Sequence, residues 1–220
     1  MDNMHIPFYK KILSFLIPVT LEKTIGNNMT VLLVQLYVNQ FMLVTPRAIY
    51  SYGTRYNPFR KPFAGMQHEL KKVNSFLLLG TGLGSALSIL QKKYALFPEA
   101  TLVDNDEDVL NFSQKYMDLN SRANVEWVCQ DAVAYLNSTS RKFDLMGVDI
   151  FKDLVQPNFV TTTSFFAHCA AALQPNGTCI FNMILEDDNK IIDIQKALSE
   201  HFAEVTFILE KVNTYFICRR

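Results

Sequence analysis

The chain has 220 residues with 21 basic and 21 acidic side chains, so its formal net charge is zero. It lacks the excess of basic residues with which general nucleic-acid-binding proteins neutralise phosphates, and we expect no nucleic-acid partner. Hydrophobic residues make up 49% of the chain and charged residues 19%. This composition supplies the core of one ordinary domain, or of a domain with a small appendage.

Apolar segments near the N-terminus do not predict a membrane protein. Residues Ile12–Val19 are too few to span a bilayer, and no small-residue cleavage site follows them. Residues Val31–Val44 are interrupted by Gln35, Asn39 and Gln40. We therefore expect a cytoplasmic protein without a membrane partner.

Residues 1–65 are predicted to form a small β-rich domain. Segments 16–22, 30–37 and 41–44 are rich in β-forming residues and are separated by turn-forming residues at 26–28 and 38–40, which predicts an antiparallel sheet. The following segment, Tyr50–Phe59, is dense in aromatic side chains. It is interpreted either as a lid over a neighbouring pocket or as a packing surface for a partner subunit.

Residues 66–220 alternate between predicted strands and helices, which indicates right-handed crossovers and a mostly parallel sheet. The predicted strands are 76–79, 100–104, 125–129, 143–148 and 178–183. The predicted helices are 85–94, one that begins after Asp106, 132–136, 162–173 and 191–202. Segments 204–210 and 214–218 predict a terminal antiparallel hairpin. An α/β sheet with such a hairpin resembles the Rossmann-like class I S-adenosylmethionine-dependent methyltransferase fold.

A glycine-rich turn is the strongest functional signal. The segment Gly80-Thr81-Gly82-Leu83-Gly84 follows an apolar strand and opens a helix, and Asp104-Asn105 follows the next strand. Glycines allow a sharp turn close to a ligand, and an acid at that position accepts hydrogen bonds from ribose hydroxyls. This predicts a pocket for an adenosine-bearing ligand, with a tight turn without ligand as the alternative. The spacing differs from the Gly-x-Gly-x-x-Gly dinucleotide fingerprint.

Three aspartates follow successive predicted strands, namely Asp104, Asp131 and Asp149. Ligands of open parallel sheets bind beyond the carboxyl ends of the strands. We therefore predict Asp104 at the ribose, Asp131 with Ala132 at the adenine, and Asp149 at the reacting end. There Asp149 would steady a sulfonium or take a proton from an attacking amine. Capping a helix or starting a turn is the alternative role for each aspartate.

The cysteines and histidines do not predict a metal site. The four cysteines have no Cys-x-x-Cys spacing, and the four histidines lack ligand spacing. Cys129, Cys179 and Cys218 fall in predicted strands, where we expect small core residues in a reducing compartment.

Four segments resemble the spermidine synthase (polyamine aminopropyltransferase) group of the class I methyltransferase fold in order and spacing. They are residues 78–85, 103–109, 130–132 and 143–149, and residues 23–27 are similar to the N-terminal hairpin domain of that group. The resemblance implies that Asp104 binds the ribose, Asp131 binds the adenine, and Asp149 assists deprotonation of a polyamine. It also implies a homodimer formed through the N-terminal sheet.

Two positions depart from the pattern of that group. Its glycine loop holds an aspartate for the amine of decarboxylated S-adenosylmethionine where this chain has Leu83, and its active-site loop holds a second aspartate where this chain has Lys152. Its Tyr-Gln pair has no clear counterpart in Tyr50–Gln67. Losing acids weakens the binding of a cation. Ordinary S-adenosylmethionine remains plausible, because its carboxylate would rest on amides near Gly84 and Ser85.

We therefore predict a methyltransferase-like protein that uses S-adenosylmethionine and a small-molecule acceptor, with amines among the candidates. Methyl transfer asks mainly for the positioning of two reactants. The alternatives are a polyamine aminopropyltransferase that uses decarboxylated S-adenosylmethionine, and a non-catalytic binding or scaffold protein. The predicted acceptor wall consists of Tyr52, Tyr56, Phe59, Phe151, Lys152 and Met183.

Overall fold

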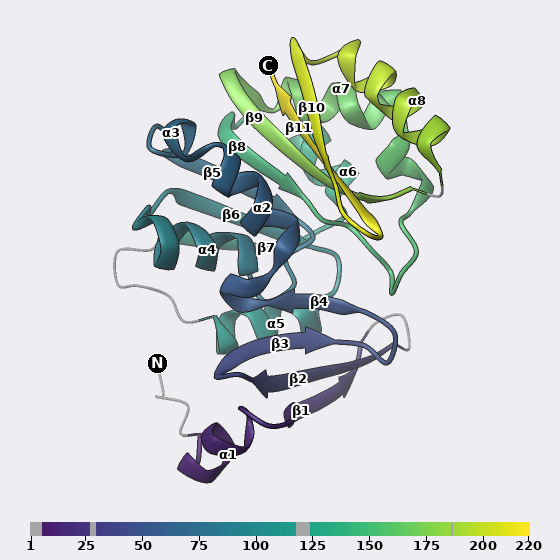
Figure 1. Cartoon of the computed structure of the whole chain (residues 1–220). Coiled ribbons are helices and arrows are strands. Elements are labelled where there is room, and N and C mark those ends of the chain that lie inside the picture. The colour runs from purple at the N-terminus through teal and green to yellow at the C-terminus, as the bar shows by residue number, and fades with distance from the viewer. Residues whose placement is uncertain (1–5, 27–29, 118–123, 186) are drawn as a thin grey trace.

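Two β-sheets organise the chain (Figure 1). The computed structural model describes residues 6–26, 30–117, 124–185 and 187–220. Two residues of the predicted turn at 26–28, and with them Asn27 of the segment 23–27, lie outside this part of the chain.

The smaller sheet is antiparallel and follows the order of the chain. It consists of β1 (Val19–Ile25), β2 (Val31–Tyr37), β3 (Gln40–Val44) and β4 (Ile49–Tyr52). Strand β2 alternates between buried and partly exposed side chains, as expected of a sheet with one covered face. Val38 and Asn39 have φ values of 49° and 55° in the tight turn between β2 and β3. The predicted small antiparallel sheet is therefore present.

Two N-terminal elements escaped prediction. Helix α1 (Phe8–Leu13) lies on the side of the small sheet remote from the larger one, and none of its side chains is buried (Figure 1). Strand β4 falls in the segment expected to be an aromatic loop. A strand of four residues is too short to show an alternation of apolar and polar side chains in the sequence. Its extended conformation is stabilised by its pairing with β3.

The larger sheet has seven strands in the order β10-β11-β9-β8-β5-β6-β7. These strands are β5 (Ser75–Leu79), β6 (Glu99–Asp104), β7 (Asn124–Cys129), β8 (Phe143–Val148), β9 (Leu173–Ile184), β10 (Glu204–Leu209) and β11 (Asn213–Arg219). Strand β11 pairs antiparallel with both β9 and β10, and the other pairs of neighbouring strands in this sheet are parallel. The mostly parallel α/β sheet with a terminal hairpin is confirmed. Strand β9 begins at Leu173, five residues before the predicted start of that strand at 178.

Helices cover both faces of the larger sheet, because successive side chains of a strand point to opposite faces. Phe76 and Leu78 pack with α2 (Asn57–Gly65), α3 (Gln67–Leu70) and α4 (Ser85–Tyr94). Leu77 and Leu79 pack with α6 (Ala132–Ser138), α7 (Thr163–Ala171) and α8 (Asp188–Ser199). Helices α2 and α3 were not predicted. Phe59 of α2 is 1% exposed and packs in the core of the larger sheet, although it falls in the segment 1–65 that was predicted to form the separate N-terminal domain.

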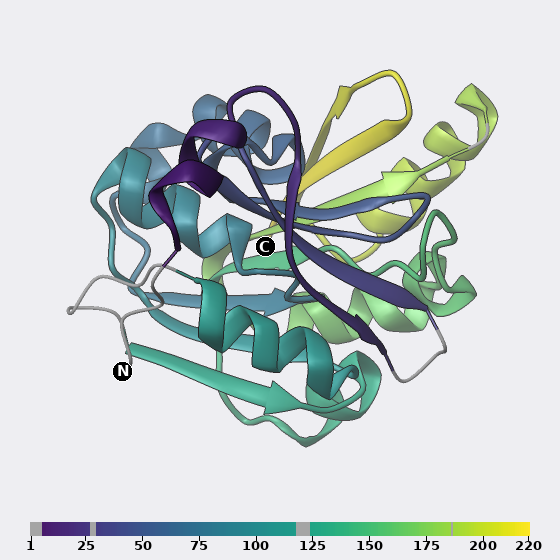
Figure 2. The same ribbon diagram turned by 90° about the horizontal axis from the view of Figure 1, so that it is seen from below.

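A third apolar cluster joins the two sheets. Leu32, Val34 and Leu43 of the small sheet pack against residues of α5 (Glu107–Tyr116) and against Leu83. Leu83 is 4% exposed, so its side chain is part of this core. This contact places the small sheet across the carboxyl ends of the parallel strands. The view from below shows the small sheet in front of the larger one (Figure 2).

The cysteines differ in their surroundings. Cys169, Cys179 and Cys218 are buried, whereas Cys129 is exposed. The expected core position of Cys129 is therefore wrong, because β7 is the edge strand of the sheet. Among the residues described, no helix has the length and apolar character needed to cross a membrane.

Candidate functional site

A cleft of about 510 Å³ lies between the carboxyl ends of the parallel strands and the small sheet. Strand β5 is flanked by β6 and β8, and the connections of the sheet proceed to either side from there. Such a switch point is where open α/β sheets bind ligands. Seven predicted site residues line the cleft: Gly80, Gly82, Asp104, Asn105, Asp131, Ala132 and Asp149.

The glycines of the turn are required by close contacts. A Cβ on Gly80, which has φ of 85°, would lie 2.1 Å from the carbonyl oxygen of Asp149. A Cβ on Gly82, with φ of 51°, would lie 2.8 Å from the carbonyl oxygen of Tyr50. Side chains would therefore clash with backbone on both sides. The glycines at 80 and 82 are therefore explained in part by the packing of this turn between β4 and the residue that follows β8, and not by ligand binding alone.

Two predicted ligand-binding residues lie away from the cleft. Gly84 begins α4 with φ of 66° and faces Met117, whose sulfur would lie 2.4 Å from an added Cβ. Thr81 is 3% exposed, and its N–H donates to Oδ2 of Asp104 at 2.8 Å. Thr81 therefore supports an acid of the cleft, and Gly84 shapes the start of a helix.

The start of α4 is covered by β4. The Ser85 hydroxyl shares a hydrogen bond of 2.5 Å with the Ser51 hydroxyl and accepts the N–H of Tyr52 at 3.0 Å. Ser85 is 3% exposed. The predicted seat for the carboxylate of S-adenosylmethionine near Gly84 and Ser85 is therefore occupied by the small sheet. The start of α4 therefore offers no seat for the carboxylate of ordinary S-adenosylmethionine.

Asp104 is held at the end of β6 by backbone donors. Besides the Thr81 amide, the N–H of Asp106 donates to its Oδ1 at 3.1 Å. Burial raises the pKa of Asp104 to about 6, and these hydrogen bonds oppose the rise. The backbone of Asn105 also donates to this carboxylate. A carboxylate has about four acceptor sites, so with three backbone donors it can still accept a ligand hydroxyl.

Asp149 follows β8 and receives a donor on each oxygen. The Tyr56 hydroxyl donates to Oδ2 at 2.7 Å, and Nδ2 of Asn182 donates to Oδ1 at 2.7 Å. Burial raises the pKa of Asp149 to about 6, although the two hydrogen bonds lower it. Burial also raises the pKa of Tyr56 well above 10, and the nearby Asp149 charge adds to the rise. Tyr56 therefore keeps its proton at neutral pH and donates a hydrogen bond to the carboxylate.

Asp131 has a different environment. Its Oδ1 accepts the N–H groups of Val133 at 2.9 Å and Ala134 at 3.0 Å, so the side chain caps α6. The residue is exposed at the rim of the cleft. Helix capping, the alternative considered for each aspartate, is therefore one role of Asp131, and its contact with an adenine stays a prediction.

The loop after β8 supplies a further acid. Lys152 is exposed and its backbone pairs with Val155. Asp153 has φ of 55°, and its N–H donates to the Tyr50 hydroxyl at 2.6 Å. Its Oδ1 is buried with no hydrogen-bond partner among the described residues, and Asp153 lines the cleft. A buried unpaired carboxylate oxygen is a vacant acceptor for a ligand cation.

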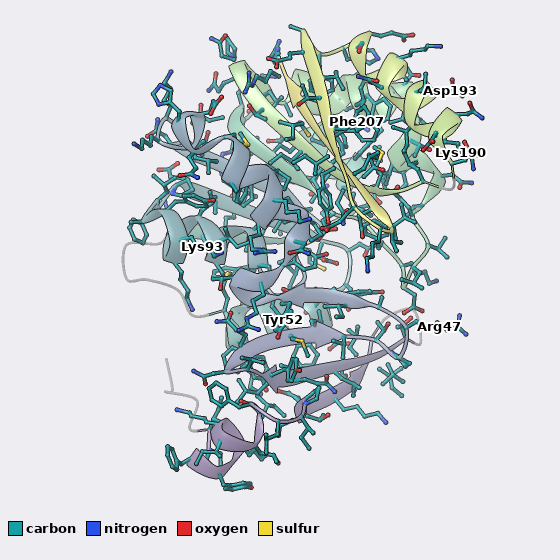
Figure 3. The ribbon with its side chains drawn as sticks, viewed as in Figure 1. Arg47, Tyr52, Lys93, Lys190, Asp193 and Phe207 are labelled. Carbon is teal, nitrogen blue, oxygen red and sulfur yellow. The ribbon has the colours of Figure 1, made fainter. Side chains whose placement is uncertain are left out.

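The predicted acceptor wall is present only in part. Tyr56, Phe151 and Lys152 line the cleft. Phe59 and Met183 are 1% and 0% exposed in the core, because they face inward from α2 and β9. Tyr52 lies at one end of β4, and Arg47 at the turn before that strand lines the cleft rim (Figure 3). Within the part of the chain that is described, no group of three or more His, Cys, Asp or Glu residues is placed to hold a metal ion.

Sequence reasoning missed Tyr56, Asn182 and Tyr50 as partners of the acids. Tyr56 is separated from Asp149 by 93 positions and Tyr50 from Asp153 by 103. No local pattern marks either pair. An aromatic-rich segment before the first strand of the larger sheet was the one available signal.

A model of the spermine/spermidine synthase domain matches residues 62–217. The chain belongs to the spermine/spermidine synthase family. A probable polyamine aminopropyl transferase of Bifidobacterium longum is 30% identical over 132 residues, which are 60% of this chain and 29% of that protein. A polyamine aminopropyltransferase of Shigella boydii is 24% identical over 147 residues, which are 64% of this chain and 51% of that protein. The chain therefore spans about half or less of the length of these curated relatives.

Solved structures show the same fold. A probable spermidine synthase from Corynebacterium glutamicum has a TM-score of 0.72 at 18% identity and covers 92% of this chain and 80% of its own. Spermidine synthase from Thermotoga maritima has a TM-score of 0.67 at 14% identity, and the match covers 91% of this chain and 72% of that protein. Human methyltransferase-like protein 13 in complex with SAH has a TM-score of 0.59 at 17% identity, and the match covers 74% of this chain and 75% of that protein. The predicted class I methyltransferase fold and the predicted family are confirmed.

Proposed function

We propose that this family member is a polyamine aminopropyltransferase that uses decarboxylated S-adenosylmethionine. The observation that carries the proposal is Asp149, a partly buried carboxylate at a strand end in the cleft with two fixed hydrogen-bond donors. The activity for which the relatives are named, polyamine aminopropyl transfer, supports the same reaction. This proposal replaces our prediction of methyl transfer, which relied on a carboxylate seat that β4 covers.

The charge of the cleft favours cationic ligands. Among the described residues, the cleft is lined by five aspartates and two cationic side chains, Arg47 and Lys152. Decarboxylated S-adenosylmethionine and a polyamine both carry only positive charge outside the adenosine. An excess of carboxylates in a partly buried cleft attracts such ligands and discriminates against an additional ligand carboxylate.

In the proposed reaction, Asp149 takes a proton from the acceptor ammonium, which frees the nitrogen lone pair. The nitrogen attacks the propyl carbon attached to the sulfonium, so a C–N bond forms while the C–S bond breaks. The electron pair of the broken bond stays on sulfur, and methylthioadenosine leaves as a neutral thioether. A carboxylate with a pKa of about 6 is ionised at neutral pH and can act as the base.

Asp153 accounts for the departure at Lys152. We propose that its unpaired Oδ1 binds the distal ammonium of the acceptor, in place of the acid that the family pattern has one position earlier. The left-handed backbone at Asp153, fixed through its N–H to the Tyr50 hydroxyl, supports this orientation. Asp104 and Asn105 would hold the ribose, and Gln130 and Ala132 would flank the adenine.

The test is an assay of the purified chain with decarboxylated S-adenosylmethionine and putrescine, with methylthioadenosine and the aminopropylated amine quantified by mass spectrometry. We expect both products in equal amounts, and a loss of about 10²–10⁴-fold in rate for Asp149→Asn, as for removal of a general base. The matched control is Asp193→Asn, an exposed residue of α8 remote from the cleft (Figure 3). Methylated amine formed from S-adenosylmethionine instead would restore the methyltransferase prediction. Absence of turnover with both donors would favour the scaffold alternative.

The homodimer and the cytoplasmic location stay predictions. For the dimer, exposed apolar side chains between residues 8 and 17 offer a contact surface, with Phe8 at 76% and Leu16 at 77% exposure. We propose that a second copy covers this surface, since α1 buries none of its side chains on its own sheet.

A further inference from the structure

Asn182 on β9 is a buried polar residue whose contacts converge on the proposed base. It is 2% exposed, and its Nδ2 donates to Oδ1 of Asp149 at 2.7 Å. Its Oδ1 accepts from Nδ2 of Asn213 at 2.9 Å. Asn213 begins β11, the central strand of the antiparallel part of the sheet. A chain of two amides therefore connects Asp149 to the C-terminal hairpin.

The backbone of Asn182 also holds the loop that carries the acids. Its carbonyl oxygen accepts Nε2 of Gln156 at 3.0 Å. Asp149 stands at the beginning of that loop and Gln156 near its end, so one residue contacts both ends. The intervening segment contains Asp153, the proposed ammonium-binding acid.

The contact with Asn213 decides which end of the Asn182 amide faces the base. An amide has two donors on nitrogen and two acceptor sites on oxygen. Because the oxygen accepts from Asn213, the nitrogen is directed at Asp149. Tyr56 donates to the other carboxylate oxygen. With a donor fixed on each oxygen, rotation of the carboxylate would break a hydrogen bond in a partly buried site.

We propose that Asn182 is a positioning residue for aminopropyl transfer. It orients the Asp149 carboxylate toward the acceptor amine, and Asn213 fixes the amide in the donating orientation. This inference rests on the proposed function, and it adds a role for β9 and the terminal hairpin, which carry no acid of the site.

The groups that face Asp149 determine how the variant should titrate. The hydrogen bonds from Asn182 and Tyr56 lower its pKa, while burial and the nearby Asp104 carboxylate raise it. Tyr215 on β11 is also within electrostatic range of Asp149. Removing only the Asn182 donor leaves the two raising influences in place. The carboxyl group should therefore hold its proton to a higher pH.

The experiment compares Asn182→Leu, which keeps the approximate shape without a donor, with Asn213→Ala and the matched control Asn189→Leu. Asn189 is exposed on α8. Carbon-13 NMR of the aspartate carboxyl groups follows the titration of Asp149, identified by its absence in Asp149→Asn. We expect Asn182→Leu to raise the midpoint by about one pH unit, Asn213→Ala to raise it by less, and Asn189→Leu to leave it in place.

The kinetic readout separates positioning from binding. In the same variants we expect kcat to fall about 10–100-fold for Asn182→Leu with little change in KM, because the general base is present but misdirected. The acid limb of the pH–rate profile should move upward with the NMR midpoint. An unchanged Asp149 titration in folded Asn182→Leu would overturn the proposal. If that variant does not fold, an unchanged titration in Asn213→Ala does so.

The NMR titration needs no turnover, so the two proposals fail separately. Wild-type protein without aminopropyl transfer rejects the proposed function, while the titration still decides whether Asn182 sets the state of Asp149. Turnover by the wild type with equal kcat in Asn182→Leu rejects the positioning role alone.

Discussion

Aspartates at the centre and at the edge of the larger sheet differ in their burial and in their hydrogen-bond partners. Asp104 is the last residue of β6 and Asp149 follows β8, and these two strands flank the central strand β5. Burial raises the pKa of each of these aspartates to about 6. Asp131 lies two residues after the edge strand β7, is exposed, and caps α6. The small sheet covers the centre of the carboxyl edge. An aspartate after a strand thus becomes a perturbed acid or an ordinary helix cap according to what lies over it.

The largest expected contrast is in ligand affinity. Asp104→Ala should weaken binding of methylthioadenosine by about 10–100-fold, because hydrogen bonds to a charged group contribute about 1.5–3 kcal/mol each. Asp131→Ala should weaken it by less than about threefold, because the loss of one exposed contact costs little. Isothermal titration calorimetry measures both constants. Equal losses would show that the centre and the edge contribute alike to the site.

The next contrast is the pH dependence of stability. Folding raises the pKa of Asp149 to about 6, so the folded state binds more protons than the unfolded state between about pH 4 and 6. The stability contributed by this group therefore falls as pH rises through that range, by at most about 3 kcal/mol. Asp149→Asn removes the effect.

Urea unfolding at pH 4.5 and 7.5 measures this contrast. We expect Asp149→Asn to gain about 1–2 kcal/mol over the wild type at pH 7.5, and little or nothing at pH 4.5, where the wild-type carboxyl is already protonated. A gain that is the same at both pH values would mean that the Asp149 carboxylate is not destabilised by burial.

The smallest expected effect concerns the edge. Asp131→Ala should cost about 1 kcal/mol of stability, as other N-cap losses do, and lower Tm by about 2–4 °C. Asp187, which caps α8 through the N–H of Lys190, provides a matched comparison. Asp187→Ala should give a similar change in differential scanning calorimetry. A much larger effect of Asp131→Ala would indicate that Asp131 does more than cap α6.

Much of the larger domain could be predicted because its signals are local. The helix at 85–94 and the strand at 143–148 have the predicted bounds, since each combines a clear period with flanking turn residues. Strand β4 and helix α2 were missed. Asn57–Gly65 contains Pro62 and an aromatic-rich sequence, and its helical state is stabilised by Phe59 and Phe63 packing into a distant core. Tertiary contacts there outweigh local propensity.

The candidate site divides in the same way. Gly80, Gly82, Asp104 and Asp149 were found because the turn and the strand ends are visible in the order of residues. Leu83 was interpreted as a missing cation ligand, yet its side chain belongs to the core that joins the two sheets. The left-handed backbone of Asp153 and its contact with Tyr50 became apparent only in three dimensions.

The sequence by itself determined the alternation of strands and helices, the glycine turn, and the acids at the strand ends, because these depend on neighbouring residues. Only the tertiary structure decided which acids are buried, which donors hold them, and that β4 covers the start of α4. Those properties depend on side chains brought together from distant positions, such as Tyr56 and Asp149. Burial and hydrogen bonding, which set a carboxylate's charge state, are properties of the assembled surroundings.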